Sequence, residues 1–320
     1  IFIIKKKIID IAKSHSTLRN QFGLSITRLA KKNKKIVVLD ADVAGGTGLH
    51  HFRQSFPDRF FQCGIAEQNM ISMAGGLASL GFIPIVTTFS VFMLRGLEQA
   101  RLSIAYNNVN VKLIASHPGL DVGPDGGSAQ CLEDLAIFRS LPNLKVISPA
   151  DPNEMNSAVN EIIKYKGPVY MRTGRSEIQT IFHKNYKFKI GKGKIIKGGN
   201  DLSIIACGVM VERALLASKY LEKEGIKARV VNMSTIKPID KDLIIKCARE
   251  TKKFIIAEDH NKFGGLGSAV SEVTSEYSPI PIKYVCVKDK FGMSGEPKEL
   301  AKKFNIDYKT IFKIAKKFKF

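Results

Sequence analysis

A single carboxylate, Glu67, has the neighbours that an acid–base group needs. It opens a stretch, residues 67–80, that continues as an apolar helix containing glycine. The ordinary interpretation is that its negative charge complements the dipole at a helix N-terminus. The flanking residues favour a second interpretation, in which the carboxyl group is buried. Burial raises the pKa of a carboxyl group and lets it share a proton with a basic ring nitrogen.

Two phenylalanines, Phe89 and Phe92, follow at a predicted corner between a strand and a helix. Their spacing lets both rings face the same way. Packing in the core is the usual role of such a pair. A flat heteroaromatic ring is the alternative partner, because aromatic side chains stack well on such rings. The nearby Glu67 favours this alternative.

A long glycine-rich loop, residues 117–130, follows an apolar strand. It begins with His117 and contains Asp121 and Asp125. Long loops that display polar side chains in this way often bind ligands. A purely structural loop explains the same composition equally well, so the loop alone does not decide between the two.

Two arginines stand where an anion could be held. Arg19 precedes the first core helix, and Arg175 ends the last strand of the predicted first domain. A guanidinium group matches phosphate oxygens because its N–H donors form a planar fork. For each residue taken alone, a solvated surface arginine is an equally good explanation.

Residues 63–70, 75–78 and 87–92 resemble the pyrimidine-binding domain of transketolase. The resemblance extends from about Arg19 to the end of the chain, so it rests on more than one motif. It implies an enzyme that uses thiamine diphosphate to transfer a two-carbon ketol unit between sugar phosphates.

The resemblance implies a cofactor-binding role for several residues. Glu67 would be catalytic and would pair with N1′ of the aminopyrimidine ring of thiamine diphosphate. Phe89 and Phe92 would enclose that ring, and Asp42 would lie near the cofactor at a subunit interface. Arg95 is a departure, because the family often has another aromatic residue at this position.

The resemblance also implies how the sugar is bound. His117 would be catalytic and would contact the substrate, while Asp125 would recognise a substrate hydroxyl. Arg19 and Arg175 would hold the sugar phosphate. Ala129 is a second departure, because the family often has a second histidine there. Another residue, or a histidine of a partner chain, would have to take that role.

The segment that binds Mg²⁺ and the diphosphate in thiamine enzymes has no counterpart in this sequence. Residues 123–126 resemble its Gly-Asp-Gly element only superficially, and the required asparagine does not follow. The sequence therefore predicts the C-terminal subunit of a split transketolase. An N-terminal subunit would hold most of the Mg²⁺ coordination, and we expect no metal ligand in this chain. The two chains would form a dimer of heterodimers, a heterotetramer.

Three alternatives remain open. One keeps the cofactor but changes the reaction, as in the E1 β-chain of a 2-oxo acid dehydrogenase or a deoxyxylulose-phosphate synthase-like subunit. Residues 132–136 and 148–151 look more like transketolase. The second is a non-catalytic paralogue, which the departure at Ala129 favours. The third, a nucleic-acid binder, rests on charge alone.

The composition is that of a globular protein, with 320 residues, 44% hydrophobic and 25% charged, and a formal net charge of +21. The basic residues are mostly lysines scattered along the chain. Scattered lysines without a recognition motif are typical of solvated surfaces, so we expect neither nucleic-acid nor membrane binding. No apolar run is long enough to span a bilayer.

Cysteine usage bears on the cellular compartment. The chain has five cysteines, an odd number, and none forms a CxxC pair. Free thiols in a reducing cytosol explain this pattern better than disulfides or a zinc site, which predicts a cytoplasmic protein. Residues 258–260, Glu-Asp-His, are a weak metal candidate, because successive side chains on a strand alternate between its faces.

Strand and helix patterns alternate through most of the chain, which predicts an α/β fold with two parallel-type sheet domains. We expect an N-terminal helix over 1–14, a pyrimidine-binding domain over 15–180, a linker over 181–190 and a transketolase C-terminal domain over 191–320. Within these, the patterns predict one helix over 90–106 and a hairpin over 191–199.

Overall fold

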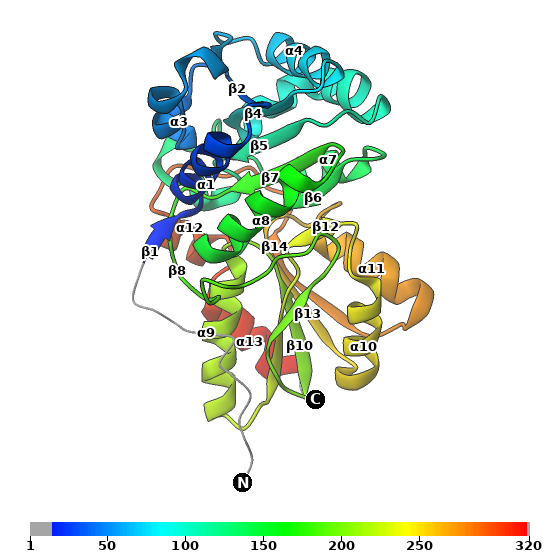
Figure 1. The fold of residues 1–320 in the computed structure, drawn as a ribbon. Coiled ribbons are helices and arrows are strands. Elements are labelled where there is room, and N and C mark those ends of the chain that lie inside the picture. Colours follow the sequence, from blue (N-terminus) through cyan, green and yellow to red (C-terminus); the bar gives the residue numbers. More distant parts are fainter. Residues whose placement is uncertain (1–14, 319–320) are drawn as a thin grey trace.

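The structure is a computed structural model that describes residues 15–318. The helix predicted over residues 1–14 lies outside the described residues. Two α/β units follow one another along the chain, and each is built around a sheet (Figure 1). The predicted α/β fold with two parallel-type sheets is confirmed.

The first sheet has seven strands. Its neighbouring strands are parallel except at one edge, where β12 pairs antiparallel with β6. In spatial order the strands are β12 (Thr235–Lys237), β6 (Lys145–Ile147), β7 (Val169–Thr173), β5 (Lys112–Ser116), β4 (Ile83–Phe89), β2 (Ile36–Asp40) and β3 (Phe60–Gln62). Because β12 comes from the second half of the chain, the sheet links the two units.

Helices cover both faces of this sheet (Figure 1). Along β2, Ile36 and Val38 pack in the cluster that contains residues of α1 and α8, whereas Val37 and Leu39 pack with residues of α4. This alternation follows from the pleat, and burial on both sides explains why the strands are apolar throughout.

The helices of the first unit include several short ones. They are α1 (Leu18–Lys32), α2 (Ala44–Thr47), α3 (His50–Ser55), η1 (Pro57–Arg59), α4 (Glu67–Ser79), α5 (Ser90–Met93), η2 (Leu94–Gly96), α6 (Leu97–Gln99), η3 (Ala100–Tyr106), η4 (Gly119–Asp125), α7 (Asp134–Ser140) and α8 (Pro152–Lys164).

The single helix predicted over residues 90–106 is wrong in detail. The segment consists of α5, η2, α6 and the π-helix η3. Gly96 marks a break, because its φ of −103° and ψ of 25° are not helical, and a Cβ there would lie 2.4 Å from Cδ1 of Ile71 on α4. The segment therefore packs closely against the helix that Glu67 opens, and π-helical turns are frequent near functional sites.

The second sheet has five strands. In spatial order they are β14 (Ile282–Val287), β13 (Phe254–Asn261), β10 (Leu202–Ala206), β11 (Ala228–Asn232) and β9 (Lys194–Lys197). The hairpin predicted over residues 191–199 is wrong, because β9 is the strand formed there and it pairs antiparallel with β11. The helices are α9 (Met210–Lys223), α10 (Lys241–Thr251), α11 (Leu266–Tyr277), α12 (Pro297–Lys303) and α13 (Tyr308–Phe318).

The residues that connect the two sheets are held by strand pairing, buried side chains and hydrogen bonds. β8 (Glu177–Gln179) pairs antiparallel with β1 (His15–Thr17). Residues 181–190 contain neither helix nor strand, yet they bury Phe182 and Phe188. The carboxylate of Asp151 accepts hydrogen bonds from the backbone N–H groups of residues 181 and 182, both at 2.6 Å. The connection is therefore packed onto the start of α8.

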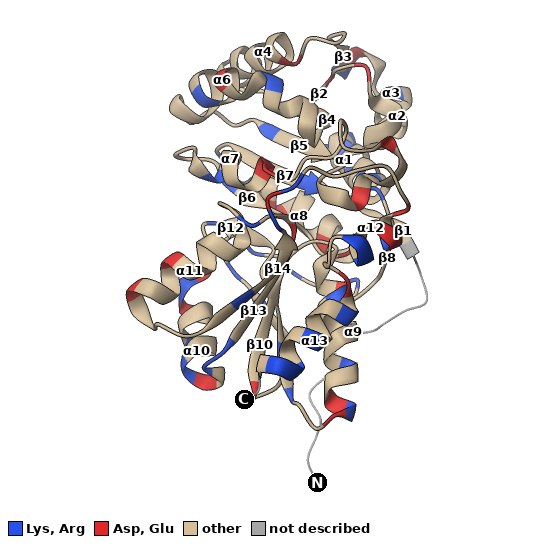
Figure 2. Ribbon diagram, turned by 180° about the vertical axis from the view of Figure 1, so that it is seen from behind, with Lys and Arg blue, Asp and Glu red and all other residues tan. Residues whose placement is uncertain are grey.

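Charge is spread over the molecule. Figure 2 shows lysine and arginine on elements of both units, interspersed with acidic residues. Among the described residues, no helix is long and apolar enough to cross a membrane.

Candidate active site

The candidate residues gather at one edge of the first sheet. Asp42 follows β2, Phe89 ends β4, His117 follows β5 and Arg175 follows β7. Because these strands are parallel, their carboxyl ends lie at the same edge, where α/β proteins bind ligands. Glu67 reaches the site from the start of α4, which follows the edge strand β3.

Glu67 is the first residue of α4 and is 3% exposed, so its predicted burial is confirmed. Its Oε2 atom lies 3.3 Å from Nε of Arg95, whose side chain is 64% exposed. The two atoms lack the alignment of a hydrogen bond, and Oε2 has no other hydrogen-bond partner in the described part of the chain. A buried carboxylate oxygen without a donor is rare, and such groups often have a functional reason.

Three aromatic rings stand beside one another. The rings of Phe89 and Phe92 are stacked, with centroids 5.2 Å apart and an interplanar angle of 8°. His117 stacks on Phe89, with centroids 3.7 Å apart. Gly46 closes the stack, because a Cβ there would lie 2.6 Å from Cε1 of Phe89. The sequence predicted that the two phenylalanines lie together, and the structure shows that His117 stacks on one of them.

His117 is held in an unusual state. Its backbone has a positive φ of 57°, and its side chain is 2% exposed. Nδ1 lies 2.8 Å from Oγ of Ser116. Burial lowers the pKa of His117 to about 4, and the positive charges of Arg19 and Arg175 act in the same direction. The imidazole is therefore neutral at neutral pH, able to accept or donate a hydrogen bond.

Arg19 and Arg175 lie close enough to influence each other. Burial lowers the pKa of Arg19, and the charge of Arg175 lowers it further. Nη1 of Arg19 donates to the carbonyl of Gly46 at 3.0 Å, whereas its buried Nε has no partner in the described residues. Two guanidinium groups with a spare donor form a site that an anion would stabilise.

Asp125 does not lie free at the site. Its Oδ1 accepts a hydrogen bond from Nη1 of Arg175 at 2.7 Å, and both side chains are partly exposed. The same Nη1 donates to the carbonyl of Val122 at 2.8 Å. Arg175 therefore fastens the loop that carries His117, and Asp125 would bind a hydroxyl while paired with this arginine.

Asp42 is exposed, and the buried acid of this turn is its neighbour Asp40. Oδ2 of Asp40 accepts from the N–H of Val43 at 3.0 Å and from Nε2 of Gln62 at 3.1 Å. Its Oδ1 has no partner among the described residues, and burial raises its pKa. Sequence reasoning missed Asp40, although its position as the last residue of an apolar strand indicates an inward side chain.

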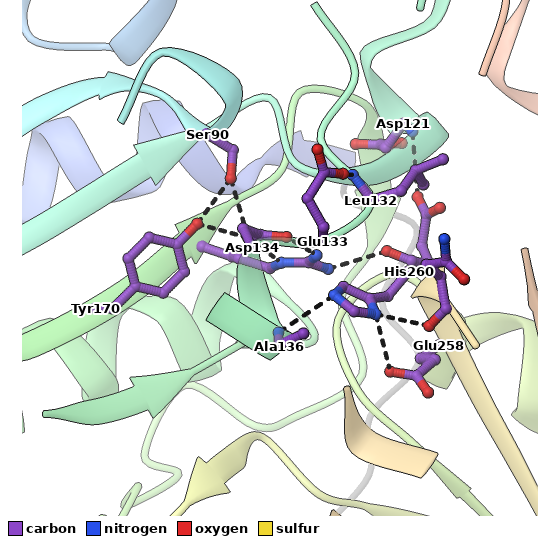
Figure 3. A network of polar contacts seen from close by, with 12 residues as sticks. Ser90, Asp121, Leu132, Glu133, Asp134, Ala136, Tyr170, Glu258 and His260 are labelled. Atoms are coloured by element: carbon purple, nitrogen blue, oxygen red, sulfur yellow. Dashed lines mark hydrogen bonds and ion pairs between the residues drawn. The ribbon is translucent and has the colours of Figure 1, made fainter. Parts of the chain in front are cut away.

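A buried polar network lies beneath the site (Figure 3). Nε of Arg172, on β7, donates to Oδ2 of Asp134 at 2.8 Å, and Asp134 also accepts from Tyr170 at 2.5 Å and Ser90 at 2.9 Å. Burial alone would raise the pKa of Asp134, but the Arg172 guanidinium holds it below its ordinary value. Nη1 of Arg172 then crosses to the second unit, where it donates to the carbonyl of Asp259 at 3.0 Å.

The three side chains of residues 258–260 take different hydrogen-bond partners, although Nδ1 of His260 also lies 3.9 Å from Oε2 of Glu258. Glu258 accepts from the start of α11, Asp259 accepts from the loop after β5, and Nδ1 of His260 lies 2.7 Å from the carbonyl of Asn261. The described residues include no group of three or more His, Cys, Asp or Glu side chains arranged to hold a metal ion. Sequence reasoning also missed Asp259 and Asp121, whose contacts join the two units.

These features define a class of site. It combines a buried carboxylate with an open oxygen, an aromatic wall, a neutral histidine and a pair of arginines at the carboxyl edge of a parallel sheet. Residues 14–180 match the family model described as transketolase, pyrimidine binding domain, and residues 191–311 match transketolase, C-terminal domain. The chain belongs to the transketolase family.

Several relatives in this family are similar to this chain over nearly their whole length. A protein from Methanocaldococcus jannaschii, described as a transketolase C-terminal section, is 42% identical over 96% of this chain and 97% of its own length. A protein from Phocaeicola vulgatus, described as one of the subunits of an apulose-4-phosphate transketolase, is 34% identical, covering 96% of this chain and 99% of that protein. A solved structure described as a split gene transketolase, inactive β4 tetramer, matches with a TM-score of 0.87 and 42% identity, covering 95% of this chain and 98% of that one.

Proposed function

We propose that this chain is the C-terminal subunit of a two-chain transketolase, which transfers a two-carbon ketol unit between sugar phosphates. The observation that carries the proposal is Oε2 of Glu67, a buried carboxylate oxygen without an aligned donor that contacts Arg95, three residues after Phe92. The relatives support it, because two of them are described as a section or subunit of a transketolase and match this chain over nearly their whole length.

The residues at this edge fit thiamine diphosphate. A protonated ring nitrogen would supply the donor that Oε2 of Glu67 lacks. Phe89 and Phe92 would cover the pyrimidine ring, and Asp42 would face the cofactor from an exposed turn. When bound, thiamine diphosphate supplies an electron sink for cleavage and formation of carbon–carbon bonds. Glu67 would hold and release a proton at the ring nitrogen, which makes it the catalytic acid–base group.

The other end of the site would bind the sugar phosphate. Arg19 and Arg175 would hold the phosphate, since an anion relieves the repulsion between them. Asp125 would bind a sugar hydroxyl. His117 would act as the second catalytic residue, because a neutral imidazole can exchange a proton with a sugar oxygen.

A second chain would complete the site. This chain has no diphosphate-binding segment in its sequence, so a partner subunit would hold Mg²⁺ and the diphosphate. Exposed apolar side chains on and beside α4 and η3 support a docking face at the cofactor end; they are Phe61, Ile65, Met73, Leu102 and Tyr106. The solved relative described as an inactive β4 tetramer supports self-association, and hence a dimer of heterodimers.

A non-catalytic paralogue is the second candidate, favoured by the contact between Arg95 and Glu67 and by Ala129. Five free cysteines support a reducing compartment such as the cytoplasm for either candidate.

The test is reconstitution. The chain is assayed for ketol transfer from xylulose 5-phosphate to ribose 5-phosphate, with Mg²⁺ and thiamine diphosphate. It is tested alone and mixed with the diphosphate-binding chain from the same organism. We expect activity in the mixture and none in either chain alone. An assembled complex that binds cofactor but converts pyruvate instead would transfer the proposal to the E1 β-type or synthase-like reactions. A complex without cofactor binding would identify the paralogue.

A further inference from the structure

The second unit reaches the sugar end of the site through Asp259, the residue that follows Glu258 on β13. We propose that Asp259 is a positioning residue, which holds the loop after β5 so that His117, Asp125 and Arg175 face the sugar phosphate together. The inference rests on the proposed function for the identity of the substrate. The contacts that support it are independent of the substrate.

Asp259 binds the backbone of the loop directly. Its Oδ1 accepts from the N–H of Leu120 at 2.9 Å, and its Oδ2 accepts from the N–H of Asp121 at 3.1 Å. The side chain of Asp259 is buried. Gly119 permits this approach, because it has a φ of +69° and a Cβ there would lie 2.4 Å from Oδ2 of Asp259.

The contact continues from the loop to the anion-binding arginine. Oδ2 of Asp121 accepts from the backbone N–H groups of Arg175 and Ser176, both at 3.0 Å. The side chain of Arg175 returns to the loop at Val122 and Asp125. One chain of hydrogen bonds therefore leads from Asp259 through the loop to the residue that would bind the phosphate.

A second contact fixes the far end of the loop. Nε2 of Gln130 donates to the carbonyl of Met293 at 2.9 Å, in the segment before α12. A Cβ at Gly126 would lie 2.5 Å from Oγ of Ser294. The glycines of the loop thus serve close packing against the second unit, and this packing reaches both ends of the loop.

The loop needs such support because its first residue is strained. His117 has a positive φ of 57°, a conformation that residues with a Cβ rarely adopt. Strained residues persist where the surrounding structure determines them. The backbone of Asp259 is itself fixed by Nη1 of Arg172 at 3.0 Å, so the support is anchored in the buried network of Figure 3.

The experiment compares two neighbouring carboxylates. Asp259→Asn removes one of the two acceptor oxygens that bind the loop. Glu258→Gln is the matched control, because Glu258 is equally buried on the same strand and accepts from the N–H groups of Leu266 at 2.7 Å and Gly267 at 2.9 Å. These bonds stay within the second unit.

Two readouts are measured on each full-length variant. Hydrogen exchange of residues 118–125 is followed in the chain alone. KM for the sugar phosphate, kcat and cofactor affinity are measured in the complex with the diphosphate-binding chain. For Asp259→Asn we expect faster exchange in the loop, a KM raised about 10-fold and a lower kcat, with cofactor affinity changed by less than about twofold. For Glu258→Gln we expect no change in the hydrogen exchange of the loop and no change in KM.

Unchanged loop exchange in Asp259→Asn would overturn the inference, and so would faster exchange with an unchanged KM in an active complex. Equal effects of both variants would reduce Asp259 to a structural role. If Asp259→Asn does not fold, Gly119→Ala tests the same contact from the loop side and should shift exchange and KM in the same directions. A wild-type complex without ketol transfer would refute the proposed function, whereas the exchange comparison would still decide whether Asp259 holds the loop.

Discussion

The two ends of the candidate site differ in how complete they are. At the cofactor end, Glu67 keeps a buried oxygen without an aligned donor, and its neighbour Arg95 is mostly exposed. At the sugar end, His117 and Arg175 lie on segments that hydrogen bonds fasten to each other and to the second unit. Under the proposed function, the sugar end would be prepared largely within this chain, apart from the buried Nε of Arg19, whereas the cofactor end would depend on groups from outside it.

The two ends also differ in the free energy that their buried polar atoms cost the folded chain. A buried polar atom without a partner costs about 1–3 kcal/mol. Natural proteins retain such a cost mainly where function uses the group. Removing the open carboxylate should therefore cost activity without costing stability, whereas disturbing the sugar end should affect both. The predictions below test this contrast.

The largest effect is expected from Glu67→Ala. Turnover of the complex should fall about 1,000-fold, because a positioned acid–base side chain contributes roughly 100- to 10,000-fold. The free energy of unfolding should stay the same or rise by about 1 kcal/mol, since a buried oxygen without a donor is removed. Steady-state ketol transfer and urea unfolding measure the two quantities.

Glu98→Gln is the control for Glu67→Ala, because Glu98 is an exposed carboxylate in the segment that packs on α4. It should change neither quantity. Normal turnover of Glu67→Ala would refute the assignment of the catalytic acid. A large loss of stability would show that the cofactor end is as tightly built as the sugar end.

His117→Asn should lower kcat about 100-fold, the usual contribution of one acid–base side chain. Unlike Glu67→Ala, it should also lower stability, because the ring packs on Phe89 and starts the strained loop. The control is His183→Asn, at an exposed histidine of the connection between the units. An unchanged kcat with reduced stability would assign His117 a structural role only.

His117 also makes stability depend on pH. Its pKa is about 4 in the folded chain and 6.5 ordinarily, so the unfolded chain takes up this proton first as pH falls. The contribution of the neutral His117 to stability is fully present above pH 6.5 and is lost as pH falls toward about 4. Between pH 7 and pH 5 the loss is about 2 kcal/mol. Urea unfolding at both pH values should show that the free energy of unfolding falls less in His117→Asn than in the wild-type chain, by this amount. An equal fall in the two proteins would contradict a buried, neutral imidazole at position 117.

His260 adds a similar loss in both proteins. Burial lowers its pKa to about 4 as well, so the His117→Asn variant should remain acid-sensitive. The comparison of the two proteins therefore isolates the share of His117, and the double variant with His260→Asn should be the least acid-sensitive.

Sequence reasoning predicted local features of the candidate site and missed the long-range ones. The burial of Glu67 and the pairing of Phe89 with Phe92 could be predicted, because the surrounding residues indicate a strand, a corner and a helix start. Asp259 could not, since its contact with Leu120 joins residues 139 positions apart in the chain. Only the packing of the two units brings them together.

The fold shows the same limit. Alternating strands and helices predicted parallel sheets, because that pattern is local. The antiparallel edge strands β9 and β12 could not be predicted, since each depends on a partner far away in the sequence. The need for glycine at position 96 could not be predicted either, because it comes from the close approach of α4.

Arg19→Met tests the sugar end by itself. KM for a phosphorylated donor should rise about 10-fold, the effect of losing one charge-assisted hydrogen bond. KM for an unphosphorylated ketose should not change, since the phosphate is the group that Arg19 would bind. Arg28→Met is the control on the same helix, where Arg28 donates to Asn156 at 2.7 Å. Equal effects on both substrates would remove Arg19 from the phosphate site.

The smallest effect, from Arg95→Ala, tests the cofactor end most directly. The cofactor ring and Arg95 would compete for the carboxylate of Glu67, which lies 3.3 Å from the guanidinium Nε. An ion pair with so exposed a partner contributes less than about 1 kcal/mol, so cofactor affinity of the complex should rise only about threefold. The gain should shrink at high salt. Titration of thiamine diphosphate at two salt concentrations measures it.

Arg101→Ala provides the control for this titration, because Arg101 is an exposed arginine a few residues along the same segment. It should leave the affinity unchanged, since its loss alters the net charge of the chain as much as the loss of Arg95 does. Weaker binding in Arg95→Ala would mean that Arg95 contacts the cofactor rather than competing with it. The cofactor end would then be better prepared within this chain than the open oxygen of Glu67 indicates, and the contrast with the sugar end would narrow.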